Sequence, residues 1–183
     1  MLQRRKILAT ILSVILCGCQ STVNTADIKG SDSEKESIKK YIIKTVYPDG
    51  TEYVSVDNGN NWCVDGNISE NPIVFIMADD NNEYKLDSLI TVKGVNTSSD
   101  YMNFSSEILL YYNNYGEWIF DPYKRAQTQT SDSIWPNSKK IINKFHLNAD
   151  NTIETMAGEY CYEKTFKDDE NNTYVCSFVF FVI

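Results

Sequence analysis

The feature that most constrains the fold is the C-terminal run from Val175 to Ile183, in which nearly every residue is apolar. Apolar side chains occupy both odd and even positions, whereas a strand with one wet face alternates apolar and polar residues. The run therefore predicts a strand that is apolar on both faces. Such a strand lies centrally in a sheet or closes a barrel, so the rest of the chain must supply its neighbours.

Earlier segments are suited to this role, because short runs rich in β-branched and aromatic residues alternate with polar turns. We predict a mainly β fold, an antiparallel meander of hairpins that forms a barrel or a two-layer sandwich. A short strand is expected at 62–64. The expected hairpins cover residues 41–56, 73–92, 106–121, 141–156 and 159–183.

The 106–121 hairpin contains the densest hydrophobic pattern in the chain. A turn centred on Asn114 and Tyr115 predicts one wholly apolar face that looks inward, although a one-residue bulge at Gly116 would change the register. The side chains expected on that face are Leu109, Tyr111, Trp118 and Phe120.

The first eighteen residues have the zones of a signal peptide, with Arg4, Arg5 and Lys6 preceding an apolar run at 7–16. This run is too short to cross a bilayer, because a spanning helix needs about 20 apolar residues. An ordinary secretory signal would fit these zones. The segment that follows them decides between that interpretation and a lipid anchor.

That segment, Leu16-Cys17-Gly18-Cys19, resembles the lipobox of bacterial lipoproteins. The resemblance implies cleavage after Gly18 and attachment of diacylglycerol to Cys19, whose freed amine usually takes a further acyl chain such as palmitate. Several chains make a stable anchor, because each buried CH₂ contributes about 0.8 kcal/mol. Gln20 stands where Asp is the usual inner-membrane retention signal of Gram-negative lipoproteins. We therefore expect a lipid-anchored protein of the bacterial cell envelope, facing the periplasm or the exterior, in the outer rather than the inner membrane.

The chain then divides into three parts: a signal peptide at 1–18, the lipidated cysteine with a flexible tether at 19–37, and one β-rich globular domain at 38–183. The tether is polar and charged, so it cannot bury enough apolar surface to order itself. A short N-terminal helix is the alternative there, because Ser33 and Glu36 fit a capping box.

Charge narrows the range of partners. The signal peptide holds three of the 17 basic residues and none of the 25 acidic ones, which leaves the mature chain 14 basic residues and a net charge near −11. Binding to phosphate backbones needs a basic face, so nucleic acid is excluded as a partner. An acidic domain suits a basic protein partner or stays soluble through its charge.

Three cysteines remain after the signal peptide and the lipidated residue are set aside. Cys161 and Cys176 are equidistant from the centre of an expected turn at Asp168 and Asp169, so a regular hairpin would place them opposite each other. We predict a disulfide between them, which an oxidising envelope compartment would preserve. A bridge from Cys63 to one of them is the alternative.

The sequence evidence for a catalytic or metal site is weak. Cys63 could act as a nucleophile only with a base, and His146 is the one histidine, in an expected strand between two apolar residues. Asp79, Asn81 and Glu83 have the alternating spacing of calcium ligands, with Asp87 further on, but Tyr84 stands where an EF-hand needs glycine. We expect no enzyme activity, no metal and no cofactor.

Binding is the function that the sequence favours. Eight aromatic residues lie between Tyr101 and Tyr123, and those outside the core are suited to contact a partner. The candidate partner contacts are Tyr112, Tyr115 and Tyr123. The long polar segment from Lys124 to Ser138 is the best candidate for a functional or mobile loop.

We therefore expect a non-enzymatic domain that recognises another protein or an envelope component. The alternative is an inhibitor or immunity lipoprotein that neutralises a basic toxin or hydrolase. The run from Phe145 to Ile153, followed by Gly158-Glu159-Tyr160, resembles hairpins of small lipocalin-like lipoproteins. This likeness favours a barrel and implies no ligand.

Overall fold

The computed structural model of the protein describes residues 42–55, 59–79, 82–86, 88–120, 130–146 and 156–183. These residues form strands and no helix, so the expected mainly β, antiparallel fold is confirmed. None of the described segments is a helix of the length and apolarity that a membrane crossing requires. The strands are β1 (Ile43–Val46), β2 (Glu52–Ser55), β3 (Trp62–Val64), β4 (Asn67–Ser69), β5 (Val74–Ala78), β6 (Glu83–Tyr84), β7 (Leu89–Asn96), β8 (Met102–Ser105), β9 (Leu109–Asn114), β10 (Glu117–Phe120), β11 (Ser131–Ile134), β12 (Ser138–His146), β13 (Gly158–Lys167) and β14 (Thr173–Val182).

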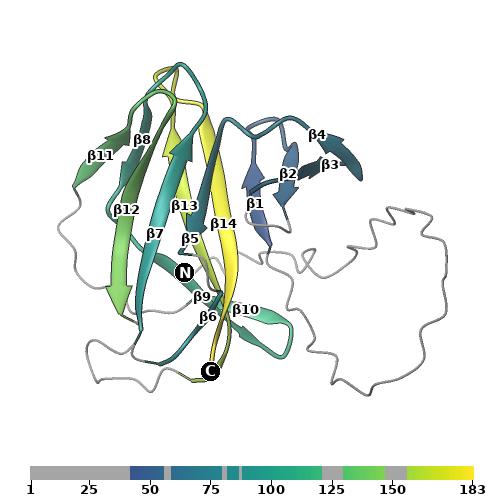
Figure 1. Cartoon of the computed structure of the whole chain (residues 1–183), viewed down its shortest axis with the longest axis vertical. Coiled ribbons are helices and arrows are strands. Elements are labelled where there is room, and N and C mark those ends of the chain that lie inside the picture. The colour runs from purple at the N-terminus through teal and green to yellow at the C-terminus, as the bar shows by residue number, and fades with distance from the viewer. Residues whose placement is uncertain (1–41, 56–58, 80–81, 87, 121–129, 147–155) are drawn as a thin grey trace, which may run out of the picture.

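The strands form two sheets (Figure 1). The larger sheet has the order β10-β9-β13-β14-β1-β2-β3-β4, with β8 and β11 attached through β13 and β6 attached to β14. The smaller sheet has the order β12-β7-β5. Its pairs are antiparallel, as are those of the larger sheet apart from the short parallel pair of β6 and β14. Strand β14 lies between β13 and β1, which confirms the central position expected of the apolar C-terminal run.

The expected hairpins at β1–β2, β5–β7, β9–β10 and β13–β14 are present, and so is the strand at 62–64. The larger sheet is not a simple meander, however, because β1 pairs with β14, which comes from the other end of the chain. The segment 124–138 is not wholly a loop, since β11 pairs with β8. Only Ile134 of β11 is buried, which explains why its pattern does not look like a strand. The partner expected for β12, at 152–156, lies almost entirely outside the described residues.

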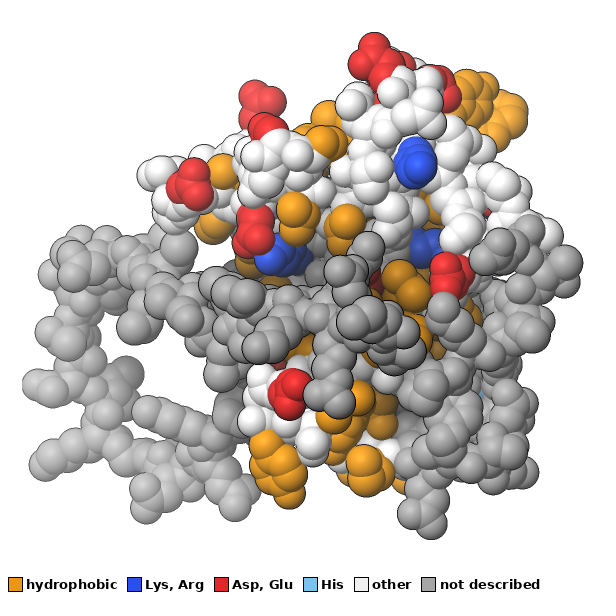
Figure 2. Space-filling view, turned by 180° about the vertical axis from the view of Figure 1, so that it is seen from behind, with side chains coloured by type: hydrophobic (Ala, Val, Ile, Leu, Met, Phe, Trp, Pro, Cys, Tyr) orange, Lys and Arg blue, Asp and Glu red, His pale blue; other side chains and the backbone are white. Residues whose placement is uncertain are grey.

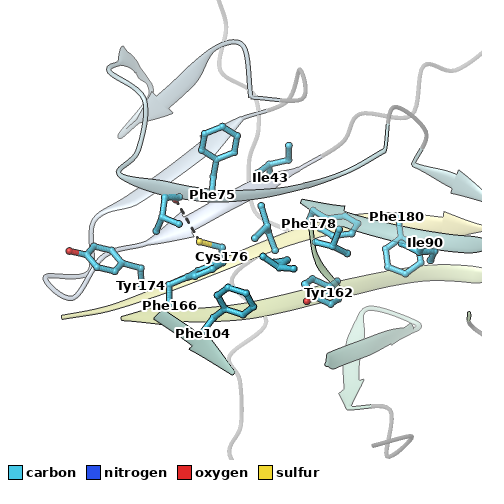
Figure 3. Packing of buried hydrophobic residues seen from close by; sticks show 14 of the residues in the cluster. Ile43, Phe75, Ile90, Phe104, Tyr162, Phe166, Tyr174, Cys176, Phe178 and Phe180 are labelled. Carbon is cyan, nitrogen blue, oxygen red and sulfur yellow. Dashed lines mark hydrogen bonds between the residues drawn. The ribbon is translucent and has the colours of Figure 1, made fainter. Parts of the chain in front are cut away.

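The core lies where the two sheets face each other (Figure 3). Inward side chains of β13 and β14, among them Tyr162, Phe166 and Phe178, are almost completely buried. Phe145 of the smaller sheet stacks on Tyr162 of the larger one, with ring centroids 5.8 Å apart and nearly parallel planes. Aromatic rings therefore supply much of the apolar surface that holds the sheets together.

Two polar side chains also tie the sheets together. Thr45 Oγ1 of β1 donates to the carbonyl oxygen of Val74 in β5 at 2.8 Å, and the Cys176 thiol of β14 donates to the same oxygen at 3.6 Å. Burial raises the pKa of the Cys176 thiol to about 12. This cysteine is therefore a protonated, hydrogen-bonded part of the core.

The register of β13 and β14 overturns the geometry behind the predicted disulfide. Cys161 pairs with Val179, and Cys176 pairs with Lys164. Because side chains alternate along a strand, the two cysteines point to opposite faces of the sheet. No disulfide joins any two of Cys63, Cys161 and Cys176, the three cysteines of the described ranges.

The β9–β10 hairpin also turns one step later than expected, at Tyr115 and Gly116, which both have positive φ angles. The four apolar side chains expected to share a face do share one, and the rings of Tyr111 and Phe120 pack edge to face at 5.5 Å. That face does not look inward, however. Leu110 and Tyr112, on the other face, pack against the core.

Candidate binding surface

An exposed aromatic pair lies at one end of the larger sheet. The side chain of Trp135 is 68% exposed and that of Tyr101 is 43% exposed. Their ring centroids are 6.2 Å apart and their planes meet at 64°. The β8–β11 register pairs Met102 with Ile134, so Tyr101 and Trp135 are the next residues beyond the last pair. At this end the turns β7–β8, β11–β12 and β13–β14 come together (Figure 1).

A buried asparagine holds the aromatic pair in place. Asn96, the last residue of β7, is 1% exposed. Its Nδ2 atom donates to the carbonyl oxygens of Asp100 at 2.7 Å, Trp135 at 3.1 Å and Ile134 at 3.3 Å. Its Oδ1 atom accepts from the backbone N–H of Ser98 at 2.9 Å and from the Ser98 hydroxyl at 2.7 Å. One side chain thus joins the turn that carries Tyr101 to the turn that carries Trp135.

The turn after Trp135 is fixed independently. Asn137 has a φ of 50°, in the left-handed region that Asn tolerates better than most residues. Its backbone N–H donates to the Ser98 carbonyl oxygen at 3.1 Å, and the Ser138 hydroxyl donates to the Trp135 carbonyl oxygen at 2.7 Å. The backbone on both sides of the indole is therefore hydrogen-bonded, although the indole itself is exposed.

The β13–β14 turn brings negative charge to the same end. The Asp168 carboxylate is buried and accepts hydrogen bonds from the N–H groups of Glu170 and Asn172, the Asn172 side chain and the Tyr174 hydroxyl. Burial alone would raise its pKa, but the hydrogen bonds from Asn172 and Tyr174 outweigh that effect and lower it. Asp168 is therefore ionised at neutral pH.

Asp100 and Tyr174, near the start of β14, are close enough to interact. Burial raises the pKa of Tyr174, and the hydrogen bond to Asp168 and the negative charge of Asp100 raise it further. The β8–β13 register pairs Lys167 with Asn103. Because the two strands are antiparallel, continuing this register by two residues brings Asp169 opposite Tyr101. We call Tyr101, Trp135, Asp100 and Asp169 the Trp135 surface.

The three turns at this end, residues 97–101, 135–137 and 168–172, contain four acidic residues and no lysine or arginine. Asp100, Asp169 and Glu170 are exposed, whereas Asp168 is buried. Figure 2 shows acidic and hydrophobic side chains next to one another at the upper end of the molecule. This end therefore combines accessible aromatic rings with negative potential.

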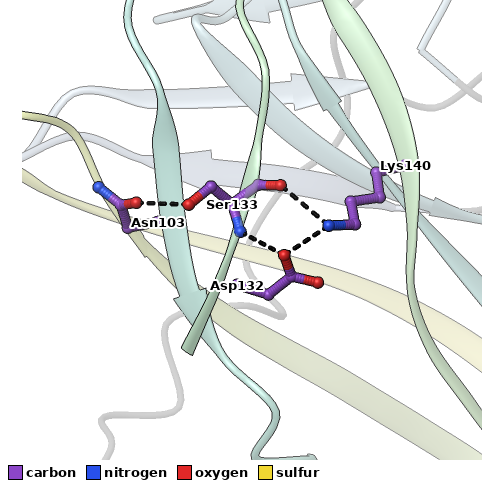
Figure 4. Close-up of polar contacts among 4 residues, drawn as sticks. All are labelled: Asn103, Asp132, Ser133 and Lys140. Atoms are coloured by element: carbon purple, nitrogen blue, oxygen red, sulfur yellow. Dashed lines mark hydrogen bonds and ion pairs between the residues drawn. The ribbon is translucent and has the colours of Figure 1, made fainter. Parts of the chain in front are cut away.

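Lys140 of the adjoining strand is already paired (Figure 4), whereas Lys139 beside it and Lys167 at the end of β13 are exposed. Lys140 Nζ of β12 contacts Asp132 Oδ1 at 2.5 Å and donates to the Ser133 carbonyl oxygen at 3.2 Å. The Ser133 hydroxyl in turn donates to Asn103 Oδ1 at 2.7 Å. The hydrogen bond from Lys140 lowers the pKa of Asp132. This network ties β11 to β12 and neutralises Lys140.

The residues predicted as partner contacts fall elsewhere. Tyr115 is fully exposed at the tip of the β9–β10 hairpin, beside the Gly158 end of β13 and therefore at the opposite end from Trp135. Tyr112 is not an exposed contact, because its ring packs on Tyr160 with centroids 5.2 Å apart. Tyr123 and the lipidation site Cys19 lie outside the described residues.

The sequence signals for the Trp135 surface were partial. The segment 124–138, singled out as a functional candidate, includes Trp135, and the aromatic cluster begins at Tyr101. Asn96 gave no signal, because one asparagine at the edge of an expected loop looks like turn chemistry. Its role becomes visible only when β7 and β11 are folded together.

The two candidate catalytic residues are not brought together. Cys63 is in β3 and His146 ends β12, so the pair is split between the two sheets and lies far apart in Figure 1. Asp79 forms an ion pair with Lys93 at 2.8 Å. Asn81 and Asp87 lie outside the described residues.

A second polar cluster is buried between the sheets. Lys164 of β13 is 2% exposed, and its Nζ atom donates to the Glu107 carbonyl oxygen at 2.6 Å and to Asn143 Oδ1 at 3.1 Å. The Tyr162 hydroxyl donates to the same Asn143 oxygen. Asn143 follows a register shift in β12, so the lysine and the tyrosine hold the irregular part of that strand against the larger sheet. Because the amine is buried and directed at protein acceptors, the cluster is suited to hold strands together.

Comparison with protein-family models finds no family that matches this sequence, and comparison with curated proteins finds no match either. Within the described ranges, no three His, Cys, Asp or Glu side chains are grouped in a way that could hold a metal ion. What the Trp135 surface can bind therefore follows from the chemistry of its own side chains.

The hydrogen bonds of Asn96 to both turns predict that replacing this side chain lowers the stability of the protein. Asn96→Ala removes hydrogen bonds to both turns and leaves buried carbonyl oxygens without this donor. At about 1 kcal/mol for each net hydrogen bond, we expect a loss of about 2–4 kcal/mol in the free energy of unfolding. Urea denaturation measures it, with Asn137→Gly as the matched control, because glycine removes an amide side chain at the same end and accepts the positive φ angle. Equal losses for the two variants would contradict the role assigned to Asn96.

The burial of the Lys164 amine predicts that the stability of the protein depends on pH. Burial lowers the pKa of Lys164 from 10.5 to about 8, while the nearby charge of Glu107 opposes that shift. Below pH 8 both folded and unfolded chains carry the proton, so the full cost of burying the charge is present. Above pH 8 the folded chain releases the proton while the unfolded chain keeps it, so stability rises by at most about 1.4 kcal/mol per pH unit.

We expect this rise between pH 8 and 9 in the wild type and its absence in Lys164→Met. Urea denaturation across that range measures it, and the difference between the two proteins cancels the contribution of other groups. Parallel pH profiles for the two proteins would refute the effect.

Proposed function

We propose that this protein is a lipid-anchored component of the bacterial cell envelope, in the outer rather than the inner membrane, whose non-enzymatic β domain binds another protein. The Leu16-Cys17-Gly18-Cys19 sequence supports the anchor and Gln20 supports the outer membrane. We place the binding site at the Trp135 surface. The observation that carries this assignment is the exposed Trp135–Tyr101 pair on a hydrogen-bonded support.

An exposed tryptophan on a firm support is favourable for binding. Large aromatic side chains supply most of the binding energy at many protein interfaces. Because Asn96 already holds both turns, a partner does not have to order this backbone on binding, and the entropic cost of association is reduced. Tyr115 is more exposed than either of these rings, but the hydrogen bonds at its turn join neighbouring residues of one hairpin.

The direction of β1 is compatible with this placement. The strand begins at Ile43, paired with Phe178 in the middle of β14, and leads to Tyr47, whose ring packs against Tyr174 near Asp168. The chain therefore enters β1 while running towards the Trp135 surface. A tether that precedes β1 would therefore join the domain at a point separate from the Trp135 surface.

Of the two expected architectures, we favour the two-layer sandwich. Phe145 on Tyr162 and the hydrogen bond from Thr45 to Val74 join two sheets face to face. Neither sheet closes on itself among the described strands. The turns at one end of such a fold are common positions for recognition residues.

The alternative function is an inhibitor or immunity lipoprotein that neutralises a basic toxin or hydrolase. The observation that favours it is the set of four acidic residues, without any basic residue, in the three turns around Trp135. Both functions use the same surface. They differ in the partner that would be captured.

The anchor can be tested separately from binding. Cys19→Ser removes the thiol that would carry diacylglycerol, so we expect the variant to lose membrane association, because the acyl chains supply the affinity. Fractionation of cells, with labelled palmitate to follow acylation, measures this. A variant that remains membrane-bound and labelled would contradict lipidation at Cys19.

The binding surface can be tested by affinity capture from detergent-solubilised envelope. We expect the wild type to retain a specific protein, Trp135→Ala to lose most of it, and Tyr115→Ala to keep it. The two variants each remove one exposed aromatic ring, at opposite ends of the domain, so each is a control for the other. Loss of the partner with Tyr115→Ala alone would move the site to the β9–β10 hairpin.

A further inference from the structure

We propose that the Trp135 surface binds the guanidinium group of an arginine side chain in a basic segment of the partner protein. This inference rests on the proposed function and adds the chemistry of the ligand. It combines three observations at one end of the molecule: the ring geometry, the excess of acidic side chains and the hydrogen-bonded support.

The ring geometry suits a cation. The ring planes of Trp135 and Tyr101 meet at 64° in an edge-to-face contact, so the two rings form a corner and not one flat platform. A cation within about 6 Å of an indole centroid is attracted by the negative face of the ring, and tryptophan is the strongest partner of this kind. Trp135 is the more exposed member of the pair, so its ring is accessible to an incoming group.

The charges around the corner favour the same ligand. Asp168 already accepts four hydrogen bonds, whereas Asp100 and Asp169 are exposed. A guanidinium can stack on an aromatic ring while its N–H groups donate to a carboxylate, a combination that a lysine ammonium cannot match. Lys140 is paired with Asp132, so Lys139 and Lys167, which are exposed beside these turns, are the internal cations with which an arginine ligand would compete.

A glycan is the competing ligand for an exposed tryptophan. Sugar rings stack on a flat aromatic face and are usually uncharged, so they would not use the acidic residues of the three turns. The 64° angle and the local charge both favour the guanidinium. Binding of a glycan is therefore an outcome that the experiment must be able to detect.

The test uses the full chain in detergent and three probes at about 0.15 M salt, where long-range attraction is largely screened. The probes are a short peptide of alternating arginine and glycine, the same peptide with glutamate in place of arginine, and tetra-N-acetylglucosamine. Calorimetry gives the dissociation constants. Tryptophan fluorescence gives a second signal, because Trp62 is buried and Trp135 is highly exposed.

We expect the arginine peptide alone to bind. Trp135→Ala should weaken its binding about fivefold, the equivalent of roughly 1 kcal/mol for a partly desolvated cation–π contact. Trp135→Phe should restore part of that loss, because a phenyl ring keeps a π face. Asp100→Asn should weaken binding about twofold to threefold and make it less sensitive to salt. Tyr115→Ala should bind as the wild type does.

Three results would overturn the inference: no binding of the arginine peptide, whether or not the tetrasaccharide binds; unchanged peptide binding in Trp135→Ala; or equal weakening in Tyr115→Ala. These results are separable from a failure of the proposed function. If a captured envelope protein is lost with Trp135→Ala but the arginine peptide does not bind, the binding function stands and the arginine chemistry is wrong. If the envelope yields no partner but the peptide binds as described, the arginine chemistry of the surface stands and the proposed binding of an envelope protein is wrong.

Discussion

The structure depends on the hydrogen bonds that the Asp168 carboxylate accepts in the β13–β14 turn. They centre the turn on Glu170 and so fix which residues of the two longest strands face each other. Because side chains alternate along a strand, this register decides which residues face the core. It places Tyr162, Lys164 and Phe166 inward, and β1, β8 and β9 then pair with strands already set in register.

The fold class and the hairpins could be predicted from sequence because both follow from local patterns of apolar and polar residues. The registers could not be predicted, because each depends on the residue at which a turn closes. Asn171 and Tyr115 both adopt positive φ angles, and each moves its turn away from the symmetrical position assumed for it. In the predicted register the thiols of Cys161 and Cys176 would face each other. The observed register places them on opposite faces of one sheet. Strand β11 was not predicted because it buries a single apolar residue, so its sequence lacks the alternation of apolar and polar residues that marks a strand.

The candidate site was harder to predict than the fold. The residues that make it, Tyr101 and Trp135, lie in segments that the sequence marked as aromatic or loop-like, but nothing in either segment points to the other. They meet because Asn96 is hydrogen-bonded both to the Tyr101 turn, which directly follows it in sequence, and to the distant Trp135 turn. A polar hub of this kind is visible only in three dimensions. The same is true of Lys164, whose position opposite Asn143 requires both sheets.

The division of labour between Asn96 and Trp135 has an evolutionary consequence. Asn96 is buried and carries the architecture of the two turns, whereas the rings and carboxylates that would meet a partner are exposed. Exchanging an exposed side chain usually changes stability by no more than about 0.5 kcal/mol. The surface can therefore diverge by single substitutions while the scaffold below it stays the same. A domain built in this way can follow a changing partner without refolding.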